Sequence, residues 1–344
     1  MKAVIYDKPW NMSITNLPTP VPASGEALLR INTVGICGSD VHGFTGESGR
    51  RAVGMVMGHE VSGTVEQLGP NVNSPAIGTR VALYNIIADH APTQEEGDPS
   101  FLNKQVIGVN LGKRGAMAEF LTVPARCLVP LSIDVPSEIG LLAEPLGVAL
   151  HGWHRIQAHN IHPQKVAIIG AGTIGLATIL IARHNKINHI ASIDMIEAKT
   201  KHAKSFGAMP VLINSDSNLK EIQKKTETTL QGKPDLVIDA VGTTDSFNTS
   251  IELVSERGTI LQIGNLAKKA TLPLQDIVSN EITLIGTYAF DRPAFNKAVS
   301  LLGKFKDELQ SFIQGYCTLS EVPDMMTSLA KGEKQPLKIV INIS

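Results

Sequence analysis

Cysteine is scarce in this chain, which has 344 residues and only three cysteines, Cys37, Cys127 and Cys317. Thiols so few and so widely separated exclude a disulfide framework of the kind that holds small secreted proteins together. The first residues, MKAVIYDKPW, also lack the layout of a signal peptide. We therefore expect the protein to act in the reducing environment of the cytoplasm.

Net charge and long apolar runs are missing as well. The 31 Lys and Arg residues nearly balance the 32 Asp and Glu residues, which gives no reason to expect a nucleic-acid or anionic-membrane partner. No stretch is apolar over the length that a membrane-spanning helix needs. Hydrophobic residues still make up 43% of the chain, enough for a sizeable core, and the length suggests two domains.

One stretch with regularly spaced glycines stands out in the second half of the sequence. Residues 165–175 read KVAIIGAGTIG, a short apolar strand followed by a turn and the start of a helix. Gly170, Gly172 and Gly175 fit G-x-G-x-x-G, which allows a tight turn, a close approach of pyrophosphate and close helix packing. A second apolar strand ends in Asp194, where a carboxylate is expected to meet ribose hydroxyls. The pattern predicts a dinucleotide site.

Strands and helices alternate from residue 166 to about residue 288. Apolar runs such as VAIIG, HIASID, DLVIDAVG and TILQIG predict strands buried on both faces, and helical segments such as TIGLATILIARHNK separate them. This alternation predicts a parallel sheet with helices on both faces. The residues expected to contact the cofactor are Gly170, Gly172, Thr173, Ile174, Gly175, Asp194, Val241 and Gly264.

Residues 1 to about 135 follow a different pattern. Short alternating segments bounded by Pro, Gly and Asn, such as MKAVIYD, EVSGTVEQLG and TRVALYN, predict the strands of a barrel or a distorted sheet. Residues 87–114 lack this alternation and are rich in acidic residues, which predicts a surface excursion. After residue 288, two helical segments precede LKIVINIS, which we expect to return to the first domain as a strand.

Two segments of the β-rich part carry more chemistry than packing requires. GICGSDVHG contains Cys37, Ser39 and His42, and GHEVSG contains His59 and Glu60. A lone cysteine is usually a small buried apolar residue, and a lone histidine is usually structural. Together, however, a thiol, an imidazole and a carboxylate form a ligand set typical of zinc, and a catalytic zinc keeps one position open for substrate.

Glu144, in LLAEPLG, is a further candidate because it lies at the boundary between the two predicted domains. A helix is expected to start here, with Pro145 in its first turn, and the helix dipole alone favours an acidic residue at that place. The alternative interpretation gives Glu144 a role at the metal, either directly or through a water molecule.

The order and spacing of these motifs resemble the zinc-dependent medium-chain dehydrogenase/reductase family over nearly the whole chain. The resemblance is carried by GICGSDVHG, GHEVSGTVEQLG, LLAEPLGVALHG, and GAGTIG followed by Asp194. The version EPLGVALH is similar to the polyol dehydrogenase branch, which includes sorbitol, galactitol-phosphate and butanediol dehydrogenases.

This resemblance implies an α/β protein of two domains. A β-rich GroES-like catalytic domain would comprise residues 1–148 and 290–344, and a Rossmann domain with a doubly wound parallel sheet would comprise residues 149–289. It also implies a homodimer or homotetramer, for which EITLIGTY is the candidate edge strand.

The resemblance further implies a reversible, NAD-dependent oxidation of a small alcohol or polyol. One catalytic zinc would be held by Cys37, His59 and Glu60, with Glu144 as ligand or water partner. Ser39 would take the proton of the substrate hydroxyl and pass it outward through His42. Met195, rather than an arginine, follows Asp194, which favours NAD over NADP.

The chain also departs from the family pattern. Residues 87–114 contain none of the four cysteines that hold a structural zinc in most members, which predicts a single zinc per chain. Ala289 and Phe290 stand where sorbitol-type enzymes have an Arg-Tyr pair, which favours a smaller or less polar alcohol. Arg50 and Arg51 are either residues of a solvated loop or receptors for an anionic substrate.

Two other functions stay open at this point. One is a metal-free quinone or enoyl reductase on the same fold, for which the set Cys37, His59 and Glu60 has no use. The other is a nucleotide-binding sensor or structural protein without catalysis, which the presence of Ser39 beside that set disfavours. His151 and His154, spaced as an i, i+3 pair, are interpreted as helix packing.

Overall fold

The computed structural model describes residues 1–87 and 105–343 and divides the chain into two compact units. Unit 1 consists of Met1–Glu144 and Asp291–Ser344, and unit 2 consists of Pro145–Phe290. The first limit falls inside helix α3 (Ala143–Ala158), whose first turn carries Glu144. In the described part of the chain, no helix combines the length and the apolar character that crossing a bilayer requires.

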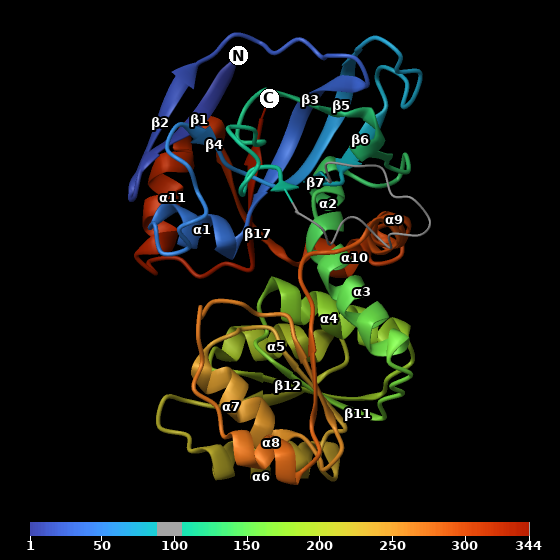
Figure 1. The fold of residues 1–344 in the computed structure, drawn as a ribbon, viewed down its shortest axis with the longest axis vertical. Helices are drawn as coiled ribbons and strands as arrows, with labels where there is room; N and C mark the ends of the chain where they lie inside the picture. Colours follow the sequence, from blue (N-terminus) through green and yellow to red (C-terminus); the bar gives the residue numbers. More distant parts are fainter. Residues whose placement is uncertain (88–104, 344) are drawn as a thin grey trace. The chain divides into compact units, whose positions relative to one another are not determined.

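Unit 1 is built mainly of antiparallel strands (Figure 1). A small sheet has the order β2-β1-β4, and a larger one the order β10-β6-β5-β3-β18-β17, with β9 also paired to β3. β7 and β8 pair with each other. The strands are β1 (Lys2–Lys8), β2 (Asn11–Asn16), β3 (Glu26–Ile36), β4 (Met55–Val56), β5 (Glu60–Leu68), β6 (Arg80–Leu83), β7 (Ile86–Ile87), β8 (Gln105–Val106), β9 (Phe120–Pro124), β10 (Leu128–Pro130), β17 (Ile313–Thr318) and β18 (Lys338–Asn342).

Helices cover the ends and flanks of these sheets. They are α1 (Gly38–Phe44), α2 (Ser137–Gly140), α9 (Arg292–Leu301), α10 (Lys306–Gln310) and α11 (Val322–Ala330), with short 3₁₀ turns η2 (Ala125–Cys127) and η3 (Leu319–Glu321). The predicted excursion is described only at its two ends, where β7 pairs with β8; residues 88–104 lie outside the described residues.

The last strand of the chain belongs to unit 1, as the alternation in LKIVINIS predicts. β18 pairs antiparallel with β3 and parallel with β17. The sequence analysis missed β17, because its side chains are largely half-exposed or exposed and it contains Gly315. It also missed α1, a two-turn helix that lies between the strands of a β-rich segment.

Unit 2 is a doubly wound parallel sheet of strand order β13-β12-β11-β14-β15-β16, which confirms the predicted fold class. Its strands are β11 (Lys165–Ile169), β12 (His189–Asp194), β13 (Met209–Leu212), β14 (Leu236–Asp239), β15 (Thr259–Gln262) and β16 (Thr283–Gly286). Besides α3, its helices are α4 (Thr173–His184), α5 (Glu197–Ser205), α6 (Leu219–Leu230), α7 (Thr244–Leu253) and α8 (Leu274–Ser279).

The central strands of unit 2 are apolar throughout because helices cover both faces of the sheet. In Figure 1, α4 and α5 lie on one face and α6 and α7 on the other. Ala167 of β11, Ile193 of β12 and Val237 of β14 are fully buried in one cluster with side chains of α6 and α7, including Ile222 and Ile251. This packing holds the carboxyl ends of β11, β12, β14 and β15 at one edge of the sheet, where ligands bind in folds of this kind.

Candidate active site

The junction between β3 and α1 presents Cys37 and Ser39. Cys37 follows the last residue of β3, has extended backbone angles (φ −90°, ψ 151°) and is the N-cap of α1. Its backbone N–H donates a hydrogen bond to Oδ2 of Asp40 over 3.2 Å, which closes the first turn of the helix. This turn fixes the position of Cys37 at the start of α1, with Ser39 in the first turn of that helix.

His59 and Glu60 reach the same place from β5. β5 pairs antiparallel with β3, and Glu60 lies opposite Gly35, where a Cβ would overlap the Glu60 carboxylate. Gly58, which precedes His59, has φ +94°, in the left-handed region that favours glycine. The two glycines thus allow His59 and Glu60 to lie beside the end of β3, next to Cys37.

Cys37, His59 and Glu60 form a cluster that can hold a metal ion, since their ligand atoms all lie within 4.8 Å of one another. His59 and Glu60 are buried. Charged groups already lie beside two of their atoms, with Oδ1 of Asp40 3.3 Å from Nδ1 of His59 and Nζ of Lys338 2.7 Å from Oε2 of Glu60. Thiolate, imidazole and carboxylate are the donors that zinc takes. The donor set therefore fits zinc.

Asp40, which the sequence analysis did not single out, supports His59. Asp40 is fully buried, and its Oδ1 lies 3.3 Å from Nδ1 of His59. Burial raises the pKa of Asp40, but the charges of His59 and Arg51 outweigh burial and bring the pKa to about 2. Burial lowers the pKa of His59, yet Asp40 holds it well above its usual value. A metal that binds this imidazole must therefore displace a proton.

Arg51 is a buried structural residue, and both sequence-based interpretations of it are wrong. Its side chain is 1% exposed, neither on a solvated loop nor open to an anionic substrate. Nη2 donates to Oδ1 of Asp40 (3.1 Å) and to the backbone carbonyl of Ser39 (3.2 Å), and Nη1 donates to the carbonyl of Val109 (3.3 Å). The buried carboxylate of Asp40 draws the guanidinium inward. Arg50, its neighbour, is exposed.

Lys338 of β18 is a second buried cation that the sequence analysis missed. Its Nζ donates to Oε1 of Glu60 over 2.7 Å and to the carbonyl of Ile36 over 3.3 Å. The side chains of Lys338 and Glu60 are 2% and 1% exposed. Burial lowers the pKa of Lys338, but the negative charge of Glu60 more than offsets burial and raises it above the usual value. Lys338 therefore stays charged and anchors the Glu60 carboxylate.

Glu144 lies near the cluster rather than within it. Nδ2 of Asn85 donates to Oε1 of Glu144 over 3.5 Å and to the carbonyl of His59 over 3.0 Å. Burial raises the pKa of Glu144; the charge of Glu60 also raises it, and His59 opposes the rise. Glu144 thus interacts electrostatically with two of the candidate ligands, which suits a carboxylate that reaches the metal through water.

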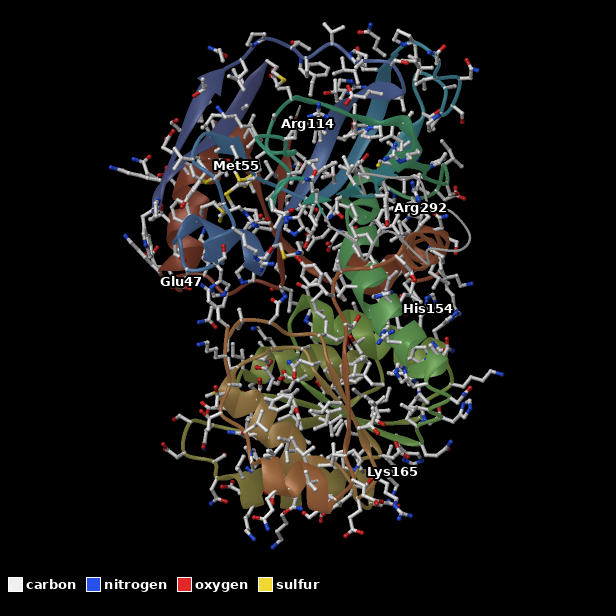
Figure 2. The ribbon with its side chains drawn as sticks, viewed as in Figure 1. Glu47, Met55, Arg114, His154, Lys165 and Arg292 are labelled. Atoms are coloured by element: carbon white, nitrogen blue, oxygen red, sulfur yellow. The ribbon has the colours of Figure 1, made fainter. Side chains whose placement is uncertain are left out.

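The predicted proton-relay residues lie on or beside α1. Oγ of Ser39 is 3.5 Å from Nε2 of His59, at the edge of the metal-binding cluster. Nδ1 of His42 is 2.8 Å from Oε2 of Glu47, and both side chains are exposed; Figure 2 shows Glu47 at the surface of unit 1. His42 is therefore already oriented by a carboxylate on the solvent side.

The glycine turn of unit 2 has the geometry of a phosphate cradle. Gly170 has φ +92°, and a Cβ on Gly175 would overlap the carbonyl of Gly170, so both positions need glycine for the turn itself. A Cβ on Gly172 would meet nothing within 4 Å. Gly172 is also the N-cap of α4 and offers no side chain to the helix N–H groups. This open space at a helix N-terminus fits a dinucleotide pyrophosphate.

Asp194 closes the cradle at the end of β12. Its Oδ2 accepts a hydrogen bond from the backbone N–H of Ala171 (2.7 Å), and Oδ1 accepts one from that of Ile196 (2.8 Å). The carboxylate is therefore fixed beside the glycine turn. Val241 and Gly264, also predicted to contact the cofactor, follow β14 and β15 at the same edge of the sheet. In the same unit, Phe290 is fully buried and Ala289 half-buried.

Comparison with known sequences gives matches over both units. Residues 23–133 match the family "Alcohol dehydrogenase GroES-like domain", and residues 173–304 match the family "Zinc-binding dehydrogenase". Sorbitol dehydrogenase of Ovis aries is 29% identical over 337 residues, which cover 96% of this chain and 93% of that protein.

Solved structures show the same fold. A putative zinc-binding dehydrogenase from Sinorhizobium meliloti 1021, bound to NADP, has a TM-score of 0.88 and 25% identity, and the match covers 99% of this chain and 98% of that one. A short chain alcohol dehydrogenase from E. coli CFT073, complexed with NADH, has a TM-score of 0.87 at 24% identity, with 99% of each chain covered. The second likeness supports the fold alone.

Proposed function

The chain belongs to the zinc-dependent medium-chain dehydrogenase/reductase family, polyol branch, and from this premise we propose that it oxidises a secondary hydroxyl of a small alcohol or polyol with NAD. The reverse reaction, reduction of the ketone, uses the same residues. The proposal rests on the cluster of half-buried Cys37 with buried His59 and Glu60 in unit 1, whose ligand atoms lie within 4.8 Å of one another.

The residues of unit 1 have two roles in the proposed reaction, zinc binding and proton transfer. A zinc ion held by Cys37, His59 and Glu60 would act as a Lewis acid that lowers the pKa of the substrate hydroxyl. Ser39 accepts the proton of that hydroxyl as its own proton passes to His42, which Glu47 orients toward solvent. General acid–base groups of this kind typically contribute roughly 10²–10⁴-fold to the rate.

The residues of unit 2 select and hold the cofactor. Bound NAD would supply the hydride acceptor for the carbinol carbon, and the alcohol would become a ketone through the loss of one proton and one hydride. The carboxylate of Asp194 can accept hydrogen bonds from ribose hydroxyls but repels a 2′-phosphate. Met195 follows it and is exposed, so no guanidinium stands there to receive that phosphate. These features support NAD rather than NADP as the cofactor.

The experiment that tests the proposal is a panel of diols, polyols and sugar phosphates, each offered with NAD and with NADP while the absorbance of the reduced cofactor is followed. Cys37→Ser is expected to abolish turnover, and the matched thiol control Cys317→Ser, at a buried position remote from the cluster in sequence, is expected to keep it. Turnover of a quinone or enone by metal-depleted protein would support the metal-free reductase instead. Cofactor binding without turnover of any substrate would support the non-catalytic protein.

The two edges of the sheet in unit 2 support a further proposal, that the chain self-associates through β16. The edge strand β13 contains Pro210, which lacks an N–H group and so disfavours pairing of another strand with that edge. The other edge strand, β16, exposes Leu284 (46%), and nearby Leu274 (65%) and Val278 (69%) are also exposed. A second copy of the chain would cover this apolar edge and give a dimer.

Light scattering on the full chain tests this part of the proposal. Leu284→Arg should produce monomers, whereas the control Leu212→Arg, on the edge strand β13 and 44% exposed, should keep the oligomer. Equal masses for the two variants would refute the assigned edge.

The cytoplasm is the compartment proposed for the enzyme, because Cys37 must stay reduced to bind zinc.

A further inference from the structure

A buried carboxylate in unit 2 has no part in the reaction described above. Asp239 is the last residue of β14 and is fully buried. Its Oδ1 accepts hydrogen bonds from the backbone N–H groups of Val241 (2.8 Å) and Gly242 (2.9 Å). Its Oδ2 accepts hydrogen bonds from Oγ of Ser246 (2.9 Å) and Nε2 of Gln262 (2.9 Å). A buried carboxylate with four donors is a rigid anchor rather than a group that reacts.

Gln262 connects this anchor to the neighbouring strand. It is the last residue of β15, and its Nε2 donates both to Asp239 and to the carbonyl of Gly264, 2.8 Å away. The backbone N–H of Gly264 in turn donates to the carbonyl of Asp239 over 2.8 Å. Side chain and backbone of Asp239 therefore hold the turn after β14 and the turn after β15 at once.

The two turns pack backbone against backbone and form what we call the platform, residues 240–242 and 263–265. A Cβ on Gly242 would overlap the backbone of Gly264, and a Cβ on Gly264 would overlap the backbone of Val241. Gly242 also has φ +81°. Since no side chain separates the turns, a shift of one turn must move the other.

The strand order indicates which part of a dinucleotide the platform meets. β11, with the glycine turn, lies between β12 on one side and β14 on the other. A dinucleotide crosses the sheet at this switch point, so its two nucleotide halves lie over opposite sides of β11. Under the proposed function, Asp194 at the end of β12 binds the adenosine ribose. The platform, at the ends of β14 and β15, therefore faces the nicotinamide half.

We propose that Asp239, acting through Gln262, is a positioning residue that fixes the platform against the nicotinamide half of the cofactor. The inference rests on the proposed function, because it requires that unit 2 binds NAD. Asp239 itself is fully buried, so a bound cofactor could not contact it directly. Its effect passes through the backbone of Val241 and Gly264, so it should act more strongly on the nicotinamide half of the cofactor than on the adenosine half.

Substitution of Asp239 by Asn tests the anchor with almost no change in volume. The Asn oxygen can still accept from the N–H groups of Val241 and Gly242. Its Nδ2, however, faces Nε2 of Gln262, so that two donors meet and the bond to β15 is lost. Gln262→Leu removes the same link from the other side and retains the carboxylate. Asp235→Asn is the matched control.

The control lies at the far end of the same strand. Asp235 precedes β14, and its carboxylate accepts from the backbone N–H groups of Gln164 and Lys165. Lys165 begins β11, so this contact is at the amino ends of the strands, near the lower edge of unit 2 in Figure 2. Substitution of either aspartate could lower the stability of the sheet in general, whereas only substitution of Asp239 should disturb the position of the cofactor.

The experiment is calorimetric titration of the zinc-loaded full chain with NADH and, separately, with ADP, which carries the adenosine and both phosphates but no nicotinamide riboside. Asp239→Asn and Gln262→Leu should weaken NADH binding by about tenfold, the equivalent of one hydrogen bond to a charged group, and change ADP binding less than twofold. Asp235→Asn should change neither affinity.

Three results would overturn the inference, and one of them would also overturn the proposed function. Equal losses of affinity for NADH and for ADP would refute the positioning role. An unchanged affinity for NADH in both variants would refute it as well. Neither result would contradict the proposal that unit 2 binds NAD. If Asp239→Asn does not fold, Gln262→Leu alone gives the decision. If the unmodified protein binds neither NADH nor ADP, the proposed function itself fails and the inference fails with it.

Discussion

Replacement of Arg51 by Met is the perturbation whose effect on stability the structure defines most sharply. In the native protein, Nη2 of Arg51 lies 3.1 Å from Oδ1 of Asp40, and the two side chains are 1% and 0% exposed. The substitution keeps the length of the side chain but removes one of the two cationic partners of the buried Asp40 carboxylate and leaves His59 as the other. Loss of one partner of a buried ion pair costs about 3–5 kcal/mol.

This loss should be visible in the melting temperature of unit 1. For a unit of this size, about 1 kcal/mol corresponds to roughly 2–4 °C, so Arg51→Met should melt roughly 6–20 °C lower than the unmodified protein. Arg51→Lys retains the charge but cannot reach Asp40, Ser39 and Val109 at once, so an intermediate loss is expected. Turnover should fall as well, because the carbonyl of Ser39 loses a donor that holds α1 in place.

The assay separates the two units by their tryptophans. The sequence contains two, Trp10 in unit 1 and Trp153 in unit 2, so a Trp153→Phe background reports unit 1 through Trp10. Trp10 packs against Phe44, the last residue of α1. Arg50→Met, one residue away and exposed, is the matched control and should melt like the unmodified protein. Equal melting temperatures for the variants at residues 50 and 51 would refute the reasoning.

Three further predictions follow from the site. Ser39→Ala should leave zinc content and NADH affinity unchanged and lower kcat by roughly 10²–10⁴-fold, and an unchanged kcat would remove Ser39 from the relay. Asp194→Ala should narrow the preference for NAD over NADP, measured as the ratio of their kcat/KM values, and a preference for NADP in the unmodified protein would contradict this role. Lys338→Met leaves the Glu60 carboxylate buried without a cation, so zinc should raise the melting temperature of this variant more than that of the unmodified protein; equal shifts would show that Lys338 does not neutralise Glu60.

The sequence predicts unit 2 well because its signals are local. The glycines at 170, 172 and 175 need to be read only against the strand before them and the helix after them, and the apolar runs identify buried parallel strands. The alternation of strands and helices predicts a parallel sheet, whereas the order of its strands is known only from the structure. The anchor Asp239 was not predicted, because an acidic residue at a strand end has no distinctive pattern until its four donors are known.

The candidate metal site is different, because its parts meet only through long-range pairing. Cys37, His59 and Glu60 were grouped by the chemistry of their side chains and by the resemblance to a family, and in the structure it is the register of β3 with β5 that joins them. Lys338 lies 278 residues from its partner Glu60 in sequence, and no spacing rule connects them. Arg51 was misinterpreted for the same reason, since its burial depends on Asp40, a residue with no motif of its own.

Zinc content measured together with activity tests the central claim most directly. We expect the cluster of Cys37, His59 and Glu60 to hold the single zinc. The excursion has potential ligands as well, but these lie outside the described residues: Asp89, His90, Glu95, Glu96 and Asp98. Elemental analysis of dialysed protein should give a ratio near one zinc per chain. Cys37→Ser should bring that ratio and the NAD-dependent turnover toward zero together, with Cys317→Ser unchanged in both. A ratio near one that persists in Cys37→Ser, or a ratio near zero in active protein, would contradict the account.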